Sequence, residues 1–302
     1  MRPFVYAVLG TLACVLCICS HTRAQVIETD TLPSSSMAQN RWQRLTNKKN
    51  LVATGIVLNT AGILYTGYNW WWKGNYHPFS MKYEGFFNNY SLGVDKAGHF
   101  YISYLYFHTI HDVMKWAGYK PRTALWVGAA IPALYALTIE VADGYTSYHF
   151  SFDDLVSNLA GIGLGILQKE VPYAHYFKVK WSYFPSAFAP WRDASLSLSD
   201  DYDGHIYWLA VDLHNALPKK IGKYWPPFLN IAAGYGVSGA SFGSQLPMER
   251  KFLLGLDYNL AHFKLKNKTL NTIKNLADFF HYPAPAWRKV GEDKATFGFP
   301  LH

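Results

Sequence analysis

Charged and imidazole side chains interrupt long apolar stretches between residues 95 and 161 of this 302-residue chain, and they constrain its fold more than any other feature. They form four short groups: Asp95-Lys96-Ala97-Gly98-His99, Glu140 with Asp143, Ser151 with Asp154, and Asn158 with Gly161. Carboxylates and imidazoles are costly to bury without partners. We therefore expect the helices that carry them to meet, so that the groups form either a satisfied polar network or a functional site.

The first 24 residues are typical of a secretory signal peptide. Arg2 supplies the positive charge, residues 5 to 18 are apolar, and Thr22-Arg23-Ala24 provides a small-residue cleavage site. All three cysteines lie in this segment (Cys14, Cys17 and Cys19). Cleavage before Gln25 would leave an exported protein without a disulfide or a thiol nucleophile. Lipid attachment at a cysteine is the alternative, although none follows the usual Leu-small-small triplet.

Composition favours an envelope surface as the partner. Apolar residues make up 50% of the chain and charged residues only 16%, which is rich in apolar residues for a soluble domain. Loss of Arg2 and Arg23 would lower the formal charge from +8 to +6, and the remaining basic residues are spread along the chain. Such a balance suits an anionic lipid surface or other envelope proteins, and no nucleic-acid motif accompanies it.

The predicted fold class is α+β, with an N-terminal bundle of four to five helices followed by an antiparallel sheet region and one further helix. After the signal peptide we expect a linker over residues 25–40, a helical domain over 41–175 and a β-rich region over 176–302. Apolar runs predict the bundle helices, and alternation of apolar and small or polar residues predicts the strands. The helices are expected at 51–68, 95–116, 123–141 and 152–169, the strands at 205–213, 228–237, 250–260 and 296–301, and the further helix at 264–280.

Two patterns indicate contact with a membrane. The first helix ends in Trp70, Trp71 and Trp72, an order that resembles an aromatic interface belt, although a buried core helix fits equally well. Each predicted strand has one apolar face, but four to six strands are too few to close an outer-membrane barrel. Membrane-spanning helices would place the basic residues at 41–49 on the wrong side of an inner membrane. We therefore expect a periplasmic helical domain that rests on or dips into a membrane, with the sheet packed on the helices.

Three interpretations of the polar groups remain open. As a structural network, Asp95 would be a helix N-cap and Ser151 with Asp154 a capping box, while His99 and Glu140 would need buried partners. As a catalytic site, His99 would act as general base, oriented by Asp95 or Asp154, and Glu140 would donate a proton from a raised pKa. As a metal site, Asp95, His99, Glu140 and Asp154 form an oxygen-rich set suited to manganese, iron or calcium. No cofactor is required, and His108 and His111 are expected on a solvent-exposed face.

At these residues the chain resembles the YfiM-like family of predicted periplasmic lipoproteins, a domain of unknown function. The family pattern is met by Asp95-Lys96-Ala97-Gly98-His99-Phe100, Glu140-Val141-Ala142-Asp143, Ser151-Phe152-Asp153-Asp154, Asn158 and Gly161. A looser similarity is to VanZ-like membrane proteins. The resemblance covers roughly residues 90 to 170 and implies an envelope location and a shared helical fold, but no activity.

We therefore expect a non-enzymatic, membrane-associated module of the cell envelope, in the periplasm and at the outer membrane. The alternative is a lipid- or cell-wall-directed hydrolase that uses His99, Glu140 and Asp154, with or without a divalent metal.

Overall fold

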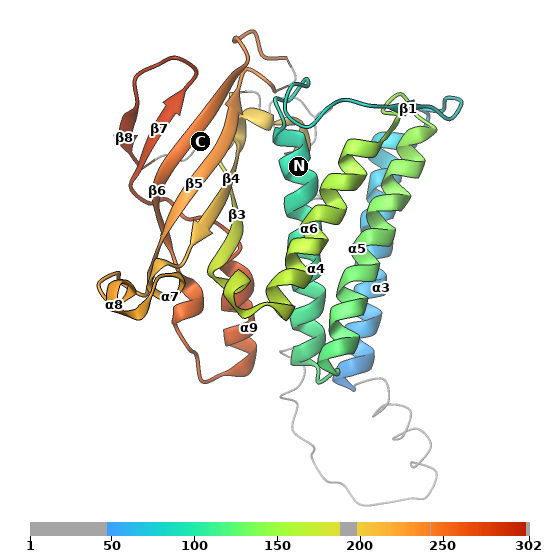
Figure 1. Cartoon of the computed structure of the whole chain (residues 1–302). Coiled ribbons are helices and arrows are strands. Elements are labelled where there is room, and N and C mark those ends of the chain that lie inside the picture. Colours follow the sequence, from blue (N-terminus) through green and yellow to red (C-terminus); the bar gives the residue numbers. More distant parts are fainter. Residues whose placement is uncertain (1–46, 188–197, 242, 300–302) are drawn as a thin grey trace, which may run out of the picture.

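The computed structural model describes residues 47–187, 198–241 and 243–299. The predicted signal peptide, the linker and the three cysteines lie outside these ranges. The described chain combines long helices with a six-stranded antiparallel sheet that stands beside them over much of the same height (Figure 1).

Four long helices precede the sheet: α3 (Lys48–Gly67), α4 (Val94–Trp116), α5 (Pro121–Gly144) and α6 (Phe152–Glu170). Three shorter helices lie within the sheet region: α7 (Leu213–Ala216), α8 (Lys219–Gly222) and α9 (Lys268–Ala277). The last of these is shorter than predicted at both ends. Its start is defined by the Asn267 side chain, which caps the helix by accepting hydrogen bonds from the backbone N–H groups of Thr269 and Leu270.

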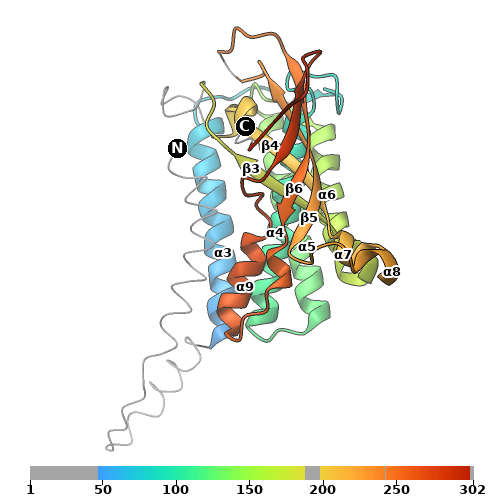
Figure 2. The same cartoon turned by 90° about the vertical axis from the view of Figure 1, so that its left-hand side faces the viewer.

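The expected N-terminal bundle of four to five helices is not confirmed. Helices α4, α5 and α6 pack together around Phe107, Leu125 and Ile162, whereas α3 buries only Val52 and Gly67. In Figure 2, α3 stands at the edge of the molecule, with much of its length free of neighbours. The packed unit is therefore three helices with a fourth lying along it.

Glycine permits the close approach of α4 and α6. A Cβ atom on Gly161 would lie 2.1 Å from the backbone oxygen of Phe100, and one on Gly165 would overlap the Phe107 ring. Gly163, in contrast, has no atom within 4 Å of its ideal Cβ position. Two of the three glycines in this helix therefore act in packing.

The principal sheet has the strand order β3-β4-β5-β6-β7-β8, and all its neighbours are antiparallel. The strands are β3 (Phe177–Tyr183), β4 (His205–Val211), β5 (Leu229–Ser238), β6 (Glu249–Tyr258), β7 (Ala286–Val290) and β8 (Thr296–Gly298). A separate parallel pair joins β1 (Met81–Lys82) to β2 (Phe150–Ser151) beside the polar helix ends.

The sheet curls until its first strand meets the segment that leads into β7. Trp181 in β3 exchanges backbone hydrogen bonds with Phe279 and His281, which covers the free edge of β3. The inner face is filled by side chains such as Trp208, which stacks on His281 at a ring separation of 3.8 Å. The curl encloses most of one face of the sheet, although Thr296 at its far edge is exposed.

The sheet packs on the helices, as expected, through part of its apolar face, while the enclosed face carries small and polar side chains together with apolar ones such as Trp208 and Leu253. Lys180 is fully buried there, with its Nζ 2.8 Å from Asp257 and 2.9 Å from Asp278. On the apolar face, Tyr207 packs against Tyr101 of α4, but Phe252, Leu254 and Tyr258 of β6 are exposed. The reason is that α4 contacts mainly β3, β4 and part of β5, whereas the curl buries most of the opposite face.

The prediction of an exposed face for His108 and His111 is wrong. Both residues are buried on α4, where His108 lies 2.9 Å from the Gln168 side chain and His111 lies 2.6 Å from Asp112. Because α4 is surrounded by helices and sheet, it has no solvent-exposed face at this level.

Candidate functional site

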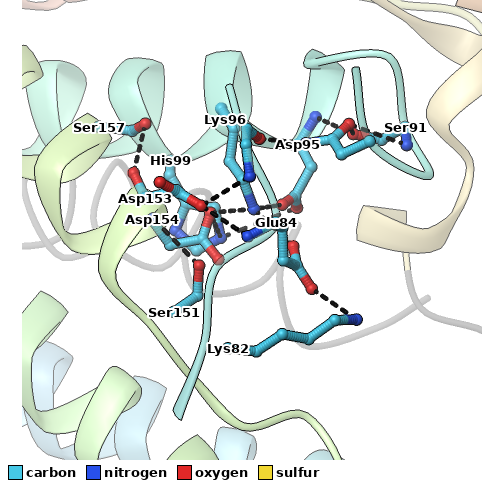
Figure 3. A network of polar contacts seen from close by, with 12 residues as sticks. Lys82, Glu84, Ser91, Asp95, Lys96, His99, Ser151, Asp153, Asp154 and Ser157 are labelled. Carbon is cyan, nitrogen blue, oxygen red and sulfur yellow. Dashed lines mark hydrogen bonds and ion pairs between the residues drawn. The ribbon is translucent and has the colours of Figure 1, made fainter. Parts of the chain in front are cut away.

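The predicted polar residues gather where the N-terminal ends of α4 and α6 meet the C-terminal end of α5. Asp95, Lys96 and His99 lie on α4, and Asp154 lies in the first turn of α6. Figure 3 shows these side chains pointing toward one another beneath the loop that carries Glu84. The structure thus brings together groups that lie far apart in the sequence.

Lys96 is the centre of the cluster. Its side chain is only 4% exposed, and its Nζ lies 2.8 Å from Glu84, 2.9 Å from Asp95 and 2.7 Å from Asp154. Burial alone would lower the pKa of Lys96, but Asp95 and Asp154 outweigh it and hold the pKa above its usual value. Lys96 therefore stays charged, and three carboxylates compensate it.

His99 lies at the open side of this cluster, with 28% of its side chain exposed. Its Nε2 is 3.8 Å from Asp95 and 3.7 Å from Asp154, distances that are too long for direct hydrogen bonds. Burial acts to lower the pKa of His99, but Asp154 and Asp95 raise it above its usual value.

Asn158 determines which ring nitrogen of His99 carries the proton. The Asn158 Oδ1 accepts a hydrogen bond from Ser103 at 2.7 Å, and its Nδ2 donates to the Asp154 carbonyl at 2.8 Å. The amide donor therefore faces His99 Nδ1, 3.1 Å away, which must act as the acceptor. The neutral imidazole then carries its hydrogen on Nε2, facing the two carboxylates.

The two carboxylates beside His99 differ in their electrostatics. Burial acts to raise the pKa of Asp95, but His99 and Lys96 hold it below its usual value. Burial raises the pKa of Asp154, and His99 and Lys96 offset this only in part. Asp95 also accepts a long hydrogen bond of 3.4 Å from Tyr202, which ties the sheet region to the cluster.

Glu140 and Asp143 have structural partners outside the open part of the cluster. The Glu140 carboxylate accepts a hydrogen bond from the Ser151 backbone N–H at 3.0 Å, and burial raises the pKa of Glu140 to about 8. Asp143 accepts one from the Trp72 indole at 2.6 Å. These acids thus join α5 to the start of α6 and to the aromatic segment after α3.

The capping predictions are met in part. Asp95 is not the N-cap of α4, because the helix begins at Val94 after Gly93, whose φ of 89° is left-handed. Ser151 does cap α6 and accepts from the Asp154 N–H at 3.3 Å. The return bond of a capping box is absent here, since the Ser151 N–H binds Glu140. Asp154 is thereby left to pair with Lys96.

Two functional residues are missed by sequence reasoning. Glu84 lies in the turn-rich segment before α4, twelve residues from its partner Lys96. Asp153 is fully buried and accepts hydrogen bonds from the backbone N–H groups of Glu84 and Gly85 at 2.8 and 2.9 Å, which positions that loop. Only the charge of Glu84 could have suggested its contact with Lys96, because no helical spacing connects the two residues. Asp153 is next to Asp154 in α6, but its partners are backbone groups of a distant loop, which the sequence does not reveal.

The arrangement of these side chains does not favour a metal site or a general base at His99. The ligand atoms of Asp95, His99 and Asp154 lie within 4.8 Å of one another, as a metal site requires, and Glu140 is not among them. However, a metal or a substrate proton would need the lone pair of Nε2, whereas the Asn158 amide favours a hydrogen on that atom. In the described ranges no hydroxyl or thiol is bonded to the His99 ring. The geometry therefore favours a charge-compensated polar network.

Comparison with known proteins gives a family match for this part of the chain. Residues 83–170 match the family model described as predicted periplasmic lipoprotein (DUF2279). The match includes α4, α5 and α6 with every residue of the polar cluster, and it supports a periplasmic or envelope location. No curated protein and no solved structure matches the chain. The looser similarity to VanZ-like membrane proteins is not supported by these comparisons.

Proposed function

We propose that this protein is a non-enzymatic envelope module that associates with a membrane, the outer membrane being the favoured one, through α3 and the outer side of α5. The polar cluster is then the element that holds α4, α5 and α6 together beside the lipid surface. The alternative, a hydrolase using His99, Glu140 and Asp154, gains no support from the site, because Glu140 is bound to the Ser151 backbone and His99 has the unfavourable tautomer.

The single observation that carries the proposal is the exposure of α3. Together with the π-helical turn at 68–72 it forms a 25-residue segment. The most apolar 18-residue window of this segment has a mean hydropathy of 1.3, and only 11% of that window is buried. Val57, Leu58 and Tyr65 are each more than half exposed. Each large apolar side chain left in water forgoes about 1.5–3 kcal/mol of burial free energy, so a lipid phase would stabilise this face.

The ends of α3 and the neighbouring α5 agree with this interpretation. Lys48 and Lys49 lie at one end of α3 and Trp70 to Trp72 at the other, as in helices that place aromatic rings at headgroup depth. Helix α5 is also long and contains an 18-residue window with a mean hydropathy of 1.6, of which 39% is buried. Its exposed side chains include Trp126 and Leu134. Helices α3 and α5 share a cluster around Val52 and Ala124.

Flotation with lipid vesicles tests the proposal. We expect the full chain to float with vesicles of phosphatidylethanolamine and phosphatidylglycerol, and Val57→Glu with Leu58→Glu to reduce the bound fraction strongly. The matched control is the variant with Leu246→Glu and Met248→Glu, two exposed apolar residues of the β5–β6 loop. This control variant should float as the wild-type chain does. A wild-type chain that stays in the soluble fraction, with a normal circular dichroism spectrum, would overturn the proposal.

A further inference from the structure

Beyond β4, much of the apolar face of the sheet is exposed among the described residues, although at one end Tyr235 and Arg250 donate hydrogen bonds to the backbone carbonyls of Leu92 and Phe87. Register places Leu209, Ala233, Leu254, Trp287 and Phe297 in one row across five neighbouring strands. All five are exposed, with the Trp287 side chain at 54%. Phe252 and Tyr258 extend the same face along β6, so that the exposed side chains form a continuous surface, here called the outer sheet face.

The opposite face of these strands is a closed interior that combines an apolar cluster, Ile206, Trp208 and Leu253, with buried polar side chains. Asn230, Lys251 and Asp257 point inward and are buried, and Asp257 pairs with Lys180. Sheets with one face in water place polar residues outside and apolar residues inside. In this sheet the exposed face is apolar and the buried face contains polar groups, and an apolar outward face is what strands that face hydrocarbon carry.

Basic residues lie at both ends of the outer sheet face. At one end, exposed Lys289 is the cross-strand neighbour of Phe252. At the other end, α8 presents exposed Lys219 and Lys220 just before β5. The distance between Phe252 and Tyr258 along β6 is about 20 Å at the usual rise of a strand. An apolar band of this height with cations at both ends complements acyl chains between anionic headgroups.

From this face we infer that the protein contacts the hydrocarbon of a membrane through the outer sheet face as well as through α3, so that sheet and helices are embedded side by side. The inference rests on the lipid association proposed above but uses a separate surface. It commits to lipid as the occupant, because a partner protein would not require lysines at both ends of the band. Figure 1 shows the sheet and the helices over much of the same height, which one lipid layer would need.

Single-cysteine labelling tests this inference and the proposed function separately. With Cys14, Cys17 and Cys19 replaced by Ala, a cysteine is introduced as Leu254→Cys on the outer sheet face, as Leu58→Cys on α3, or as Leu246→Cys in the β5–β6 loop. Each full-length variant carries a polarity-sensitive fluorophore and is mixed with vesicles of the same two lipids, with or without a nitroxide on the acyl chain. We expect a blue shift and nitroxide quenching at 254 and 58, and neither at 246.

The outcomes distinguish the two claims. Quenching at 58 without quenching at 254 would overturn the inference and leave the proposed function intact, whereas the absence of quenching at both positions would overturn both. A blue shift at 254 in the absence of vesicles would identify a protein partner or a second copy, and would also overturn the inference. Circular dichroism of each labelled variant confirms that the fold is retained.

Discussion

At the residue scale, the stability of the polar cluster depends on Lys96, because its buried ammonium group compensates the charge of three carboxylates. Removing it would leave Glu84, Asp95 and Asp154 facing one another with little solvent. We expect Lys96→Met to lower the free energy of unfolding by roughly 3–5 kcal/mol, the usual cost of breaking a buried pair. Thermal and urea unfolding would measure the change.

The chain offers a matched control for this variant. Lys82 pairs with the same Glu84 at 3.3 Å, but its side chain is 54% exposed. Lys82→Met should therefore cost no more than about 1 kcal/mol, as for other surface pairs. Equal stability losses for the two variants would show that burial of the cluster is not what makes Lys96 important.

His99 provides the prediction that depends on pH. The Asn158 amide stabilises the neutral ring, because an imidazolium would place a second hydrogen against Nδ2. The pKa of His99 should therefore rise in Asn158→Ala and rise further in Asn158→Asp, whose carboxylate accepts from the ring. Titration of the ring by NMR measures the pKa, and Ser103→Ala is the milder control because it only loosens the orientation of the amide. An unchanged pKa in both variants would contradict the assigned tautomer.

The sign of the stability effect follows from the raised pKa of His99. A histidine whose pKa is higher in the folded than in the unfolded state binds its proton more tightly when folded. Protonated His99 contributes its full stabilisation when the pH is below about 6.5, the pKa of a histidine in the unfolded chain. This contribution is lost as the pH rises through the pKa that His99 has in the folded protein. The free energy of unfolding should therefore decrease over this range, and the decrease should move to higher pH in Asn158→Asp.

At the scale of elements, the contact between α4 and α6 depends on Gly161. A methyl group there would overlap the Phe100 carbonyl, which belongs to a packed helix and cannot move alone. We expect Gly161→Ala to destabilise the protein by roughly 2 kcal/mol or more, as for other overpacked sites. Gly163→Ala is the matched control, because it faces open space and gains helix propensity. Thermal unfolding of both variants checks the difference, and similar midpoints would contradict the packing argument.

The same elements show which features can be predicted from sequence. The apolar run that ends at Gly118 predicts α4, and the one that ends before Pro172 predicts α6. The spacing of Asp95 and His99 places both residues on one face of α4. Glu84 could not be predicted, because its contact with Lys96 depends on how Asp153 holds a loop. The buried side of the sheet could not be predicted either, since period-two alternation does not show which way a sheet curls.

At the scale of the whole molecule, the net charge of +8 and the exposed apolar faces make different contributions to membrane association. Attraction between lysines and anionic headgroups is screened by salt, because the Debye length falls to about 3 Å at 1 M. Contact between apolar side chains and acyl chains does not weaken in this way. The response to salt therefore separates a protein held by charge from one held by its apolar faces.

We expect the protein to remain with membranes through washes in concentrated salt and in alkaline carbonate, and to be released by detergent. Val57→Glu with Leu58→Glu should make a larger fraction extractable by salt, because α3 would no longer contribute apolar contact and charge attraction would supply a larger share of the remaining association. Immunoblots of the pellet and supernatant measure the distribution, with the Leu246 and Met248 charge variant as the control. Complete release of the wild-type chain by salt alone would show that the exposed apolar faces of α3 and of the sheet are not in contact with lipid.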